Sequence, residues 1–426
     1  MIGPAILRSL SIVWLLLVST ACAAAARPAA TPSPSSRPIV VSSAQAATPY
    51  PLPVPGAAPV AVFFGHTLAS TTTHIISLVG LDGHVLASAN GADRTLIAQA
   101  GCGGIDASAA RCSSKPPATE LPYVSVSNSR AYFLDGDNRV RSLSADGTVV
   151  DVTTVPGSAT LHSTFAVSPD DSRIAVSVLD YSVSPVRVSL FVEDIHGGNR
   201  NQLFTSNSSY AWPVGWHAGN LVLAAGTPFP DVTVQYYLNC GYYGGCTLPT
   251  PAGATLGIHV SSAIDGSRIA TIGADCDLVG VLNSAGVLCR HGRPGGYNSA
   301  TQQTVAPIPC ATGYSFCLDL VDWNGVATRW TRGNLTTGVL TPSGKLMAGC
   351  CNPNNLIVLI PRPADGGTET VSPAWGRPDA WVDETHLVYN ANSEVRSYTA
   401  ILDTVSGASV TVEALGSLIA TLPGAL

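Results

Sequence analysis

The stretch that decides the fold is FAVSPDDSRIAVSV at residues 165–178, followed by VRVSLFVEDIHGGNRNQLF at residues 186–204. Ser168-Pro169-Asp170-Asp171 predicts a turn, because proline presets φ and the aspartates hydrogen-bond their own backbone. Residues 173–178 predict a strand, because the small and β-branched apolar residues after Arg173 are typical of a tightly stacked sheet. The first half of the stretch therefore predicts a turn that leads directly into a strand.

The second half of the stretch predicts two further strands. Residues 186–194 predict a second strand, and Gly197-Gly198 predicts a hairpin into a third strand around Gln202-Leu203. A small sheet of this kind cannot bury both of its faces alone, so similar units are expected on either side of it.

This pattern resembles the TolB-type propeller repeat, which runs from an aromatic residue through an SPDG turn and an IAF-like strand to a glycine hairpin. Thr341-Pro342-Ser343-Gly344 restates the turn, and residues 380–389 (AWVDETHLVY) start a similar unit. The resemblance implies an all-β propeller. The family's helical N-terminal domain has no counterpart in the sequence, so the resemblance extends to the architecture and not to a role with the Tol–Pal complex.

Recurrent turn-plus-strand units predict how the propeller is divided. Unit starts are expected near residues 61, 124, 166, 214, 278, 338 and 380, with insertions lengthening some intervals. A blade of four strands needs about 40–50 residues, so residues 58–426 are expected to form about seven four-stranded blades, with six or eight as alternatives. The strand-like residues 409–413 are expected to complete one sheet together with the first strands of the domain.

The beginning of the chain predicts export. Arg8 precedes a short apolar run at residues 10–18 (LSIVWLLLV), which is typical of a signal peptide over residues 1–22. Ser19-Thr20-Ala21-Cys22 resembles a bacterial lipobox, which implies a lipidated Cys22; an ordinary cleavage site within residues 21–26 is the alternative. Residues 23–57, rich in Ala, Pro and Ser, predict a disordered tether. The protein is therefore expected to be extracytoplasmic and tethered to the membrane by a lipid anchor, or else secreted.

Ten further cysteines predict disulfides, since an even number in an exported chain is typical of a disulfide framework. Their spacing favours pairing between sequence neighbours. Cys350 and Cys351 are adjacent, so either a strained vicinal disulfide or pairing with other cysteines is expected there. No CxxC pair occurs, and no zinc or other metal site is expected. The neighbour pairs are Cys102 with Cys112, Cys240 with Cys246, Cys276 with Cys289, and Cys310 with Cys317.

The sequence contains no recognisable catalytic constellation. It has no G-x-S-x-G, H-E-x-x-H or phosphate-binding glycine motif, and its nine histidines are scattered. A net charge of −6 argues against nucleic acid as a partner. The DGDN sequence at residues 135–138 is interpreted as a tight hairpin and not as a calcium loop, because Arg139 stands where a ligand is needed. No cofactor is expected.

Paired tyrosines are the most unusual candidate binding feature. Tyr236-Tyr237 and Tyr242-Tyr243 lie in and beside the loop between Cys240 and Cys246. Rigid aromatic side chains suit contact with a protein or a glycan; the alternative is that they pack the insertion onto its own blade. The predicted function is a monomeric, non-catalytic binding or scaffold module of the cell envelope. A propeller hydrolase or lyase with its active site at the central channel is the alternative.

Overall fold

The chain divides into two units, Met1–Pro51 and Leu52–Leu426, and all residues described below belong to the second. No helix among them is long and apolar enough to cross a membrane. The computed structural model describes residues 58–66, 72–95, 124–183, 185–226, 236–237, 250–251, 257–273, 276–291, 296–298, 303–305, 310, 316–333, 337–350, 356–392, 397–424 and 426.

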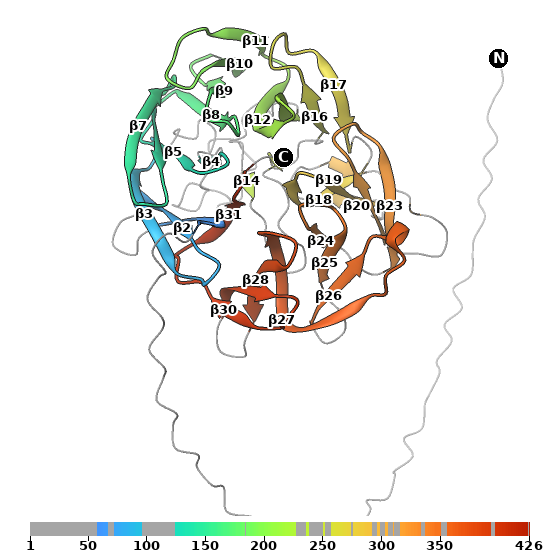
Figure 1. Cartoon of the computed structure of the whole chain (residues 1–426). Helices are drawn as coiled ribbons and strands as arrows, with labels where there is room; N and C mark the ends of the chain where they lie inside the picture. Colours follow the sequence, from blue (N-terminus) through green and yellow to red (C-terminus); the bar gives the residue numbers. More distant parts are fainter. Residues whose placement is uncertain are drawn as a thin grey trace, which may run out of the picture. The chain divides into compact units, whose positions relative to one another are not determined.

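Within Leu52–Leu426 the described residues form antiparallel sheets that follow one another around a ring, as a β-propeller requires (Figure 1). Five of these sheets have four strands each and are numbered here as blades one to five. Blade one contains β31 (Ser417–Thr421), β1 (Ala61–His66), β2 (Thr73–Val79) and β3 (Val85–Ala92). Blade two contains β4 (Val124–Val126), β5 (Ala131–Asp135), β6 (Arg139–Leu143) and β7 (Val149–Thr154). Blade three contains β8 (Leu161–Val167), β9 (Arg173–Asp180), β10 (Arg187–Asp194) and β11 (Asn201–Ser206).

Blades four and five differ from the first three because each has a small extra hairpin between its second and third strands. Blade four contains β12 (Tyr210–His217), β13 (Asn220–Gly226), β16 (Gly257–Ser261) and β17 (Arg268–Ile272), with the hairpin β14 (Tyr236–Tyr237) and β15 (Thr250–Pro251). Blade five contains β18 (Asp277–Asn283), β19 (Gly286–His291), β22 (Phe316–Val321) and β23 (Ala327–Gly333), with the hairpin β20 (Gly296–Asn298) and β21 (Gln303–Val305).

The remaining strands form one sheet of seven, called here the joined sheet. The prediction was about seven blades, and the structure has five separate four-stranded ones. The difference arises at β27, which pairs with β26 near Thr370 and Trp375 and with β28 from Gly376 onward. One unbroken strand thus links the units expected near residues 338 and 380. The joined sheet contains β24 (Thr337–Leu340), β25 (Leu346–Cys350), β26 (Leu356–Pro361), β27 (Thr370–Trp381), β28 (His386–Asn392), β29 (Ser397–Asp403) and β30 (Ser409–Thr411), with the short 3-10 helix η1 (Pro363–Asp365).

The core lies between neighbouring sheets. Phe165 of blade three, for example, packs in one buried cluster with Tyr132 and Leu134 of blade two. Tryptophans join the first strands of adjacent units: the Trp216 indole N–H donates to the Ala166 carbonyl at 3.1 Å, and that of Trp381 donates to the Val339 carbonyl at 3.0 Å. Buried indole donors are usually paired in this way. The first bond fixes blade four against blade three, and the second joins two strands of the joined sheet.

The two ends of the propeller complete one sheet, as the sequence predicted. β31 pairs antiparallel with β1, with Ala61 opposite Thr421 and Phe64 opposite Ser417. The closing strand is not the one expected, however. Residues 409–411 form β30 at the edge of the joined sheet, and the closing strand follows at Ser417–Thr421.

Candidate functional site

Strand direction places the long connections on one side of the propeller. The inner strands of the five blades are β31, β4, β8, β12 and β18 (Figure 1). In the joined sheet we count β24 and the second half of β27 with them, because Trp381 of β27 bonds to β24 as Trp216 of β12 bonds to β8. Because strands alternate in direction, connections from second to third strands and from one blade to the next start at the same end of the sheets. We call this the insertion end and the opposite end the turn end. The connections over residues 93–123, 227–256 and 292–315 all leave from strand ends on the insertion end.

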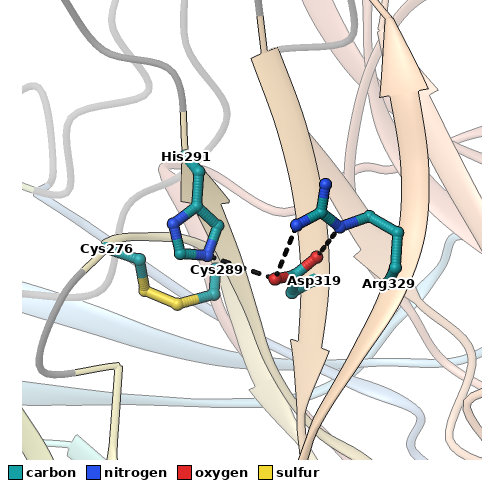
Figure 2. Close-up of a disulfide and its surroundings, with 5 residues drawn as sticks. All are labelled: Cys276, Cys289, His291, Asp319 and Arg329. Atoms are coloured by element: carbon teal, nitrogen blue, oxygen red, sulfur yellow. Dashed lines mark hydrogen bonds and ion pairs between the residues drawn. A yellow bond between two sulfur atoms is a disulfide. The ribbon is translucent and has the colours of Figure 1, made fainter. Parts of the chain in front are cut away.

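Blade five carries a cluster of charged groups beside the Cys276–Cys289 disulfide (Figure 2). The cluster lies toward the insertion end, because β19 ends there at His291. In the register of β19 and β22, Cys289 lies opposite Asp319 and His291 lies opposite Cys317. Arg329 of β23 lies opposite Asp319. Cross-strand partners project from the same face of a sheet, so all five side chains share one face of blade five.

Asp319 is the centre of this cluster. Its carboxylate accepts hydrogen bonds from Arg329 through Nε, and through Nη2 at 3.3 Å. The His291 Nε2 lies 3.2 Å from Oδ2 of Asp319, the oxygen that also accepts from Nη2 of Arg329 (Figure 2). The Asp319 and His291 side chains are 11% and 15% exposed. The free-energy penalty of burying this carboxylate is offset because it is paired with Arg329. The carboxylate also fixes the orientation of the His291 imidazole, as carboxylates do for metal-binding histidines.

Two disulfides fix the base of this region. Cys276–Cys289 joins the start of β18 to β19, with a Cα–Cα distance of 5.6 Å. Cys310–Cys317 joins the connection over residues 292–315 to β22, with a Cα–Cα distance of 6.0 Å. Both are pairs that the sequence predicted. A connection that starts from cross-linked strands is held by a rigid base, which is what a binding loop needs.

Ionisable groups also occur on the inner strands. His162 on β8 is buried beside the charge of Arg94, and burial lowers its pKa to about 4. Burial raises the pKa of Asp379 on β27 to about 7, with the Arg377 charge acting in the opposite direction. The two lie on separate sheets, and among the described residues no three His, Cys, Asp or Glu side chains are arranged to hold a metal ion.

Asp379 occupies a repeated backbone position. Pro213-Val214-Gly215-Trp216 and Pro378-Asp379-Ala380-Trp381 share the pattern Pro-x-small-Trp, and in both the pairing register shifts after the proline. Asp379 thus stands where blade four has a valine. A carboxyl group at a position suited to an apolar side chain explains the raised pKa, because burial penalises the charged form.

The predicted tyrosine site is only partly visible. Tyr236 and Tyr237 form β14, which pairs with Thr250 and Pro251 of β15. Tyr242 and Tyr243 lie outside the described residues. Cys350 is disulfide-bonded, but its predicted vicinal bond involves Cys351, which is not described. Cys22, Cys102, Cys112, Cys240 and Cys246 also lie outside the described residues.

Sequence reasoning missed the cluster at Asp319. The signal that could have found it is a cysteine followed two residues later by a polar side chain in both strands: Cys289 and His291 in one, Cys317 and Asp319 in the other. Residues two apart share a face of a strand, so each pair marks the same surface. Only the register of the two strands shows that the surfaces coincide.

Comparisons with known proteins concern the fold alone. No family profile and no curated relative matches the chain. An oligogalacturonate lyase from Vibrio parahaemolyticus is 7% identical with a TM-score of 0.41, over 81% of this chain and 98% of that one. TolB from Acinetobacter baumannii is 13% identical with a TM-score of 0.33, over 67% and 62%. The β-propeller domain of the Trilobed protease from Pyrococcus furiosus is 8% identical with a TM-score of 0.40, over 68% and 84%. The structural neighbours of this chain thus include TolB and other β-propeller proteins.

Proposed function

We propose that this protein is a non-catalytic binding or scaffold module of the cell envelope and that its contact face is the insertion end. The observation that carries the proposal is the base of blade five, where two disulfides and the Asp319 cluster fix the strands from which the connection over residues 292–315 leaves. Binding sites are commonly loops positioned by a rigid scaffold. The partner is a protein or a glycan, no cofactor is involved, and the protein acts as a monomer.

In this proposal the joined sheet counts as two blades that share β27. Each half has its own connection between third and fourth strands, and these contain Gly366 and Gly407 with φ of 69° and 75°. The corresponding turns of blades one to five place Gly83, Gly147, Gly197, Gly266 and Gly325 at φ of 73–84°. Seven turns with a glycine in the left-handed region support a seven-bladed ring, in which every blade presents its connection between second and third strands at the insertion end.

The tyrosine pairs are the proposed contact residues on blade four. Replacing Tyr236, Tyr237, Tyr242 and Tyr243 by alanine is expected to weaken binding to a glycan array at least about tenfold, because stacking and hydroxyl contacts are lost. Tyr398→Ala, an exposed tyrosine of β29 in the joined sheet, is the matched control and is expected to bind as the wild type does. Unchanged binding by a folded quadruple variant would remove the tyrosines from the contact face.

The hydrolase or lyase alternative makes a different prediction with the same reagents. Any polysaccharide that the array identifies is incubated with the full chain, and new reducing ends or unsaturated products are measured over time. A binding module leaves the polymer intact, whereas multiple turnovers would contradict the non-catalytic proposal.

We also propose that Cys22 anchors the protein to the membrane through a lipid, with residues 23–57 as the tether. The small residues before Cys22 and the short apolar run before them support this. In a bacterial host, metabolic labelling with an alkyne fatty acid is expected to mark the wild type and to be lost in Cys22→Ala. Equal labelling of both chains would contradict the anchor and leave the secreted form.

A further inference from the structure

A short segment beyond the closing strand bridges blades that are not neighbours. We call the described residues of this segment, 422–424 and 426, the strap. The backbone N–H of Leu422 donates to the Val60 carbonyl at 2.9 Å, and that of Gly424 donates to the Ser127 carbonyl at 2.9 Å. The N–H of Leu426 donates to the Trp216 carbonyl at 3.2 Å. The strap therefore starts on blade one, contacts the end of β4 in blade two, and reaches the end of β12 in blade four.

Leu426 packs into a site formed by Gly215, His217 and Trp323, which we call the Leu426 seat. The His217 Nδ1 lies 2.7 Å from the Leu426 carbonyl oxygen and donates to it, because a carbonyl oxygen only accepts. The Leu426 side chain packs against the buried cluster shared by blades four and five, which includes Trp323. Gly215 makes room for it, since a Cβ at that position would lie 2.4 Å from a Leu426 methyl group. One residue is thus recognised by its N–H, its carbonyl and its side chain.

Two residues of chain separate the strap's contact with blade two from its contact with blade four. Consecutive Cα atoms lie about 3.8 Å apart, so the chain from Gly424 to Leu426 extends at most about 7 Å. Ser127 and His217 both follow or end inner strands on the turn end, with blade three between them in the ring. The end of the chain accordingly lies among the labels of β4, β12 and β18 in Figure 1.

We propose that the strap is a second lock on the propeller and a cover over the turn end of the inner strands. The first lock, β31 on β1, closes blade one only, whereas the strap ties blade one to blades two and four. A ligand that approaches the ends of β4 and β12 from the turn end meets the strap first. This inference goes beyond the proposed function, because it holds whatever the partner is.

Hydrogen exchange on the full chain tests the lock. Amides outside strands and helices normally exchange rapidly, so protection of the Gly424 and Leu426 amides would be specific to the strap. We expect both amides to exchange at least about tenfold more slowly than in an unstructured peptide. Leu426→Gly removes the side chain from its seat, and Gly215→Val fills the seat from the blade-four side. Both variants are expected to abolish the protection of residue 426, although only one of them changes the strap.

Chemical modification of histidine tests the cover. The His217 ring is expected to react with diethyl pyrocarbonate slowly in the wild type and several-fold faster in Leu426→Gly. His196, an exposed histidine in a hairpin turn of blade three, is the internal control and is expected to react equally in both. Unprotected Gly424 and Leu426 amides in the wild type would overturn the proposal, as would equal His217 reactivity in the wild type and the variant.

Discussion

Replacing Gly83 by alanine is expected to lower the free energy of unfolding by about 2–4 kcal/mol, whereas the same change at Gly147 is expected to cost only about 1 kcal/mol. Both glycines follow an aspartate in the turn between the third and fourth strands of a blade, and their φ values are 80° and 82°. The strain of a side chain in the left-handed region is therefore the same at the two positions, and it accounts for the shared part of the loss.

The additional loss at Gly83 comes from the seam where the ring closes. A Cβ at Gly83 would lie 2.3 Å from the carbonyl oxygen of Thr411 in β30, whereas a Cβ at Gly147 would have no atom within 4 Å. The Glu413 N–H also donates to the Gly83 carbonyl at 3.0 Å, so the turn cannot move away without losing a hydrogen bond. Backbone atoms yield less readily than a flexible side chain, and overpacking of this kind costs about 1–3 kcal/mol.

Urea denaturation of the full chains, with the disulfides intact, measures the difference between the two variants. Matched m-values would show that the same unit unfolds in each. Equal losses of unfolding free energy for Gly83→Ala and Gly147→Ala would contradict the close contact between the turn of blade one and Thr411 of β30.

Local turn chemistry made the repeat predictable from the sequence. The turn at Ser168-Pro169-Asp170-Asp171 folds as expected: the Ser168 hydroxyl donates to Asp170 at 2.6 Å and accepts from the Arg173 N–H at 2.9 Å. The strand after it, β9, begins at Arg173 as predicted and runs two residues beyond Val178. Such turns depend on three or four consecutive residues, so a single repeat can reveal them.

Long-range pairing was less predictable because it depends on which of several similar strands reaches a given edge. Residues 409–411 and 417–421 are both strand-like, and only the folded ring shows that the second of them joins β1. β27 was hidden because it contains Pro373 and Pro378, and prolines argue against a long strand. Pro378 lies where the register shifts, so the strand continues past it. The cluster at Asp319 likewise depends on a register that spacing alone does not reveal.

Acidification is expected to destabilise the protein through two buried histidines. Burial lowers the pKa of His162 and that of His259 from 6.5 to about 4, and the charges of Arg94 and Arg268 contribute in the same direction. Between these pH values the unfolded chain binds protons that the folded chain excludes. The stability is therefore fully present above pH 6.5 and is lost as the pH falls toward 4. Each histidine accounts for up to about 3 kcal/mol.

Asp379 has the opposite effect on the pH dependence of stability and is tested in the same experiment. Its pKa is raised from 3.8 to about 7, so the folded chain holds a proton that the unfolded chain has released, and stability falls as the pH rises through this window. Denaturation of full chains at several pH values between about 4.5 and about 8 separates the contribution of the histidines from that of Asp379. The double variant His162→Gln, His259→Gln is expected to flatten the acid limb, whereas Asp379→Asn is expected to steepen it. A double variant as acid-labile as the wild type would contradict the lowered pKa values. The histidines would then bind protons equally in the folded and unfolded chains, which requires local opening of β8 and β16.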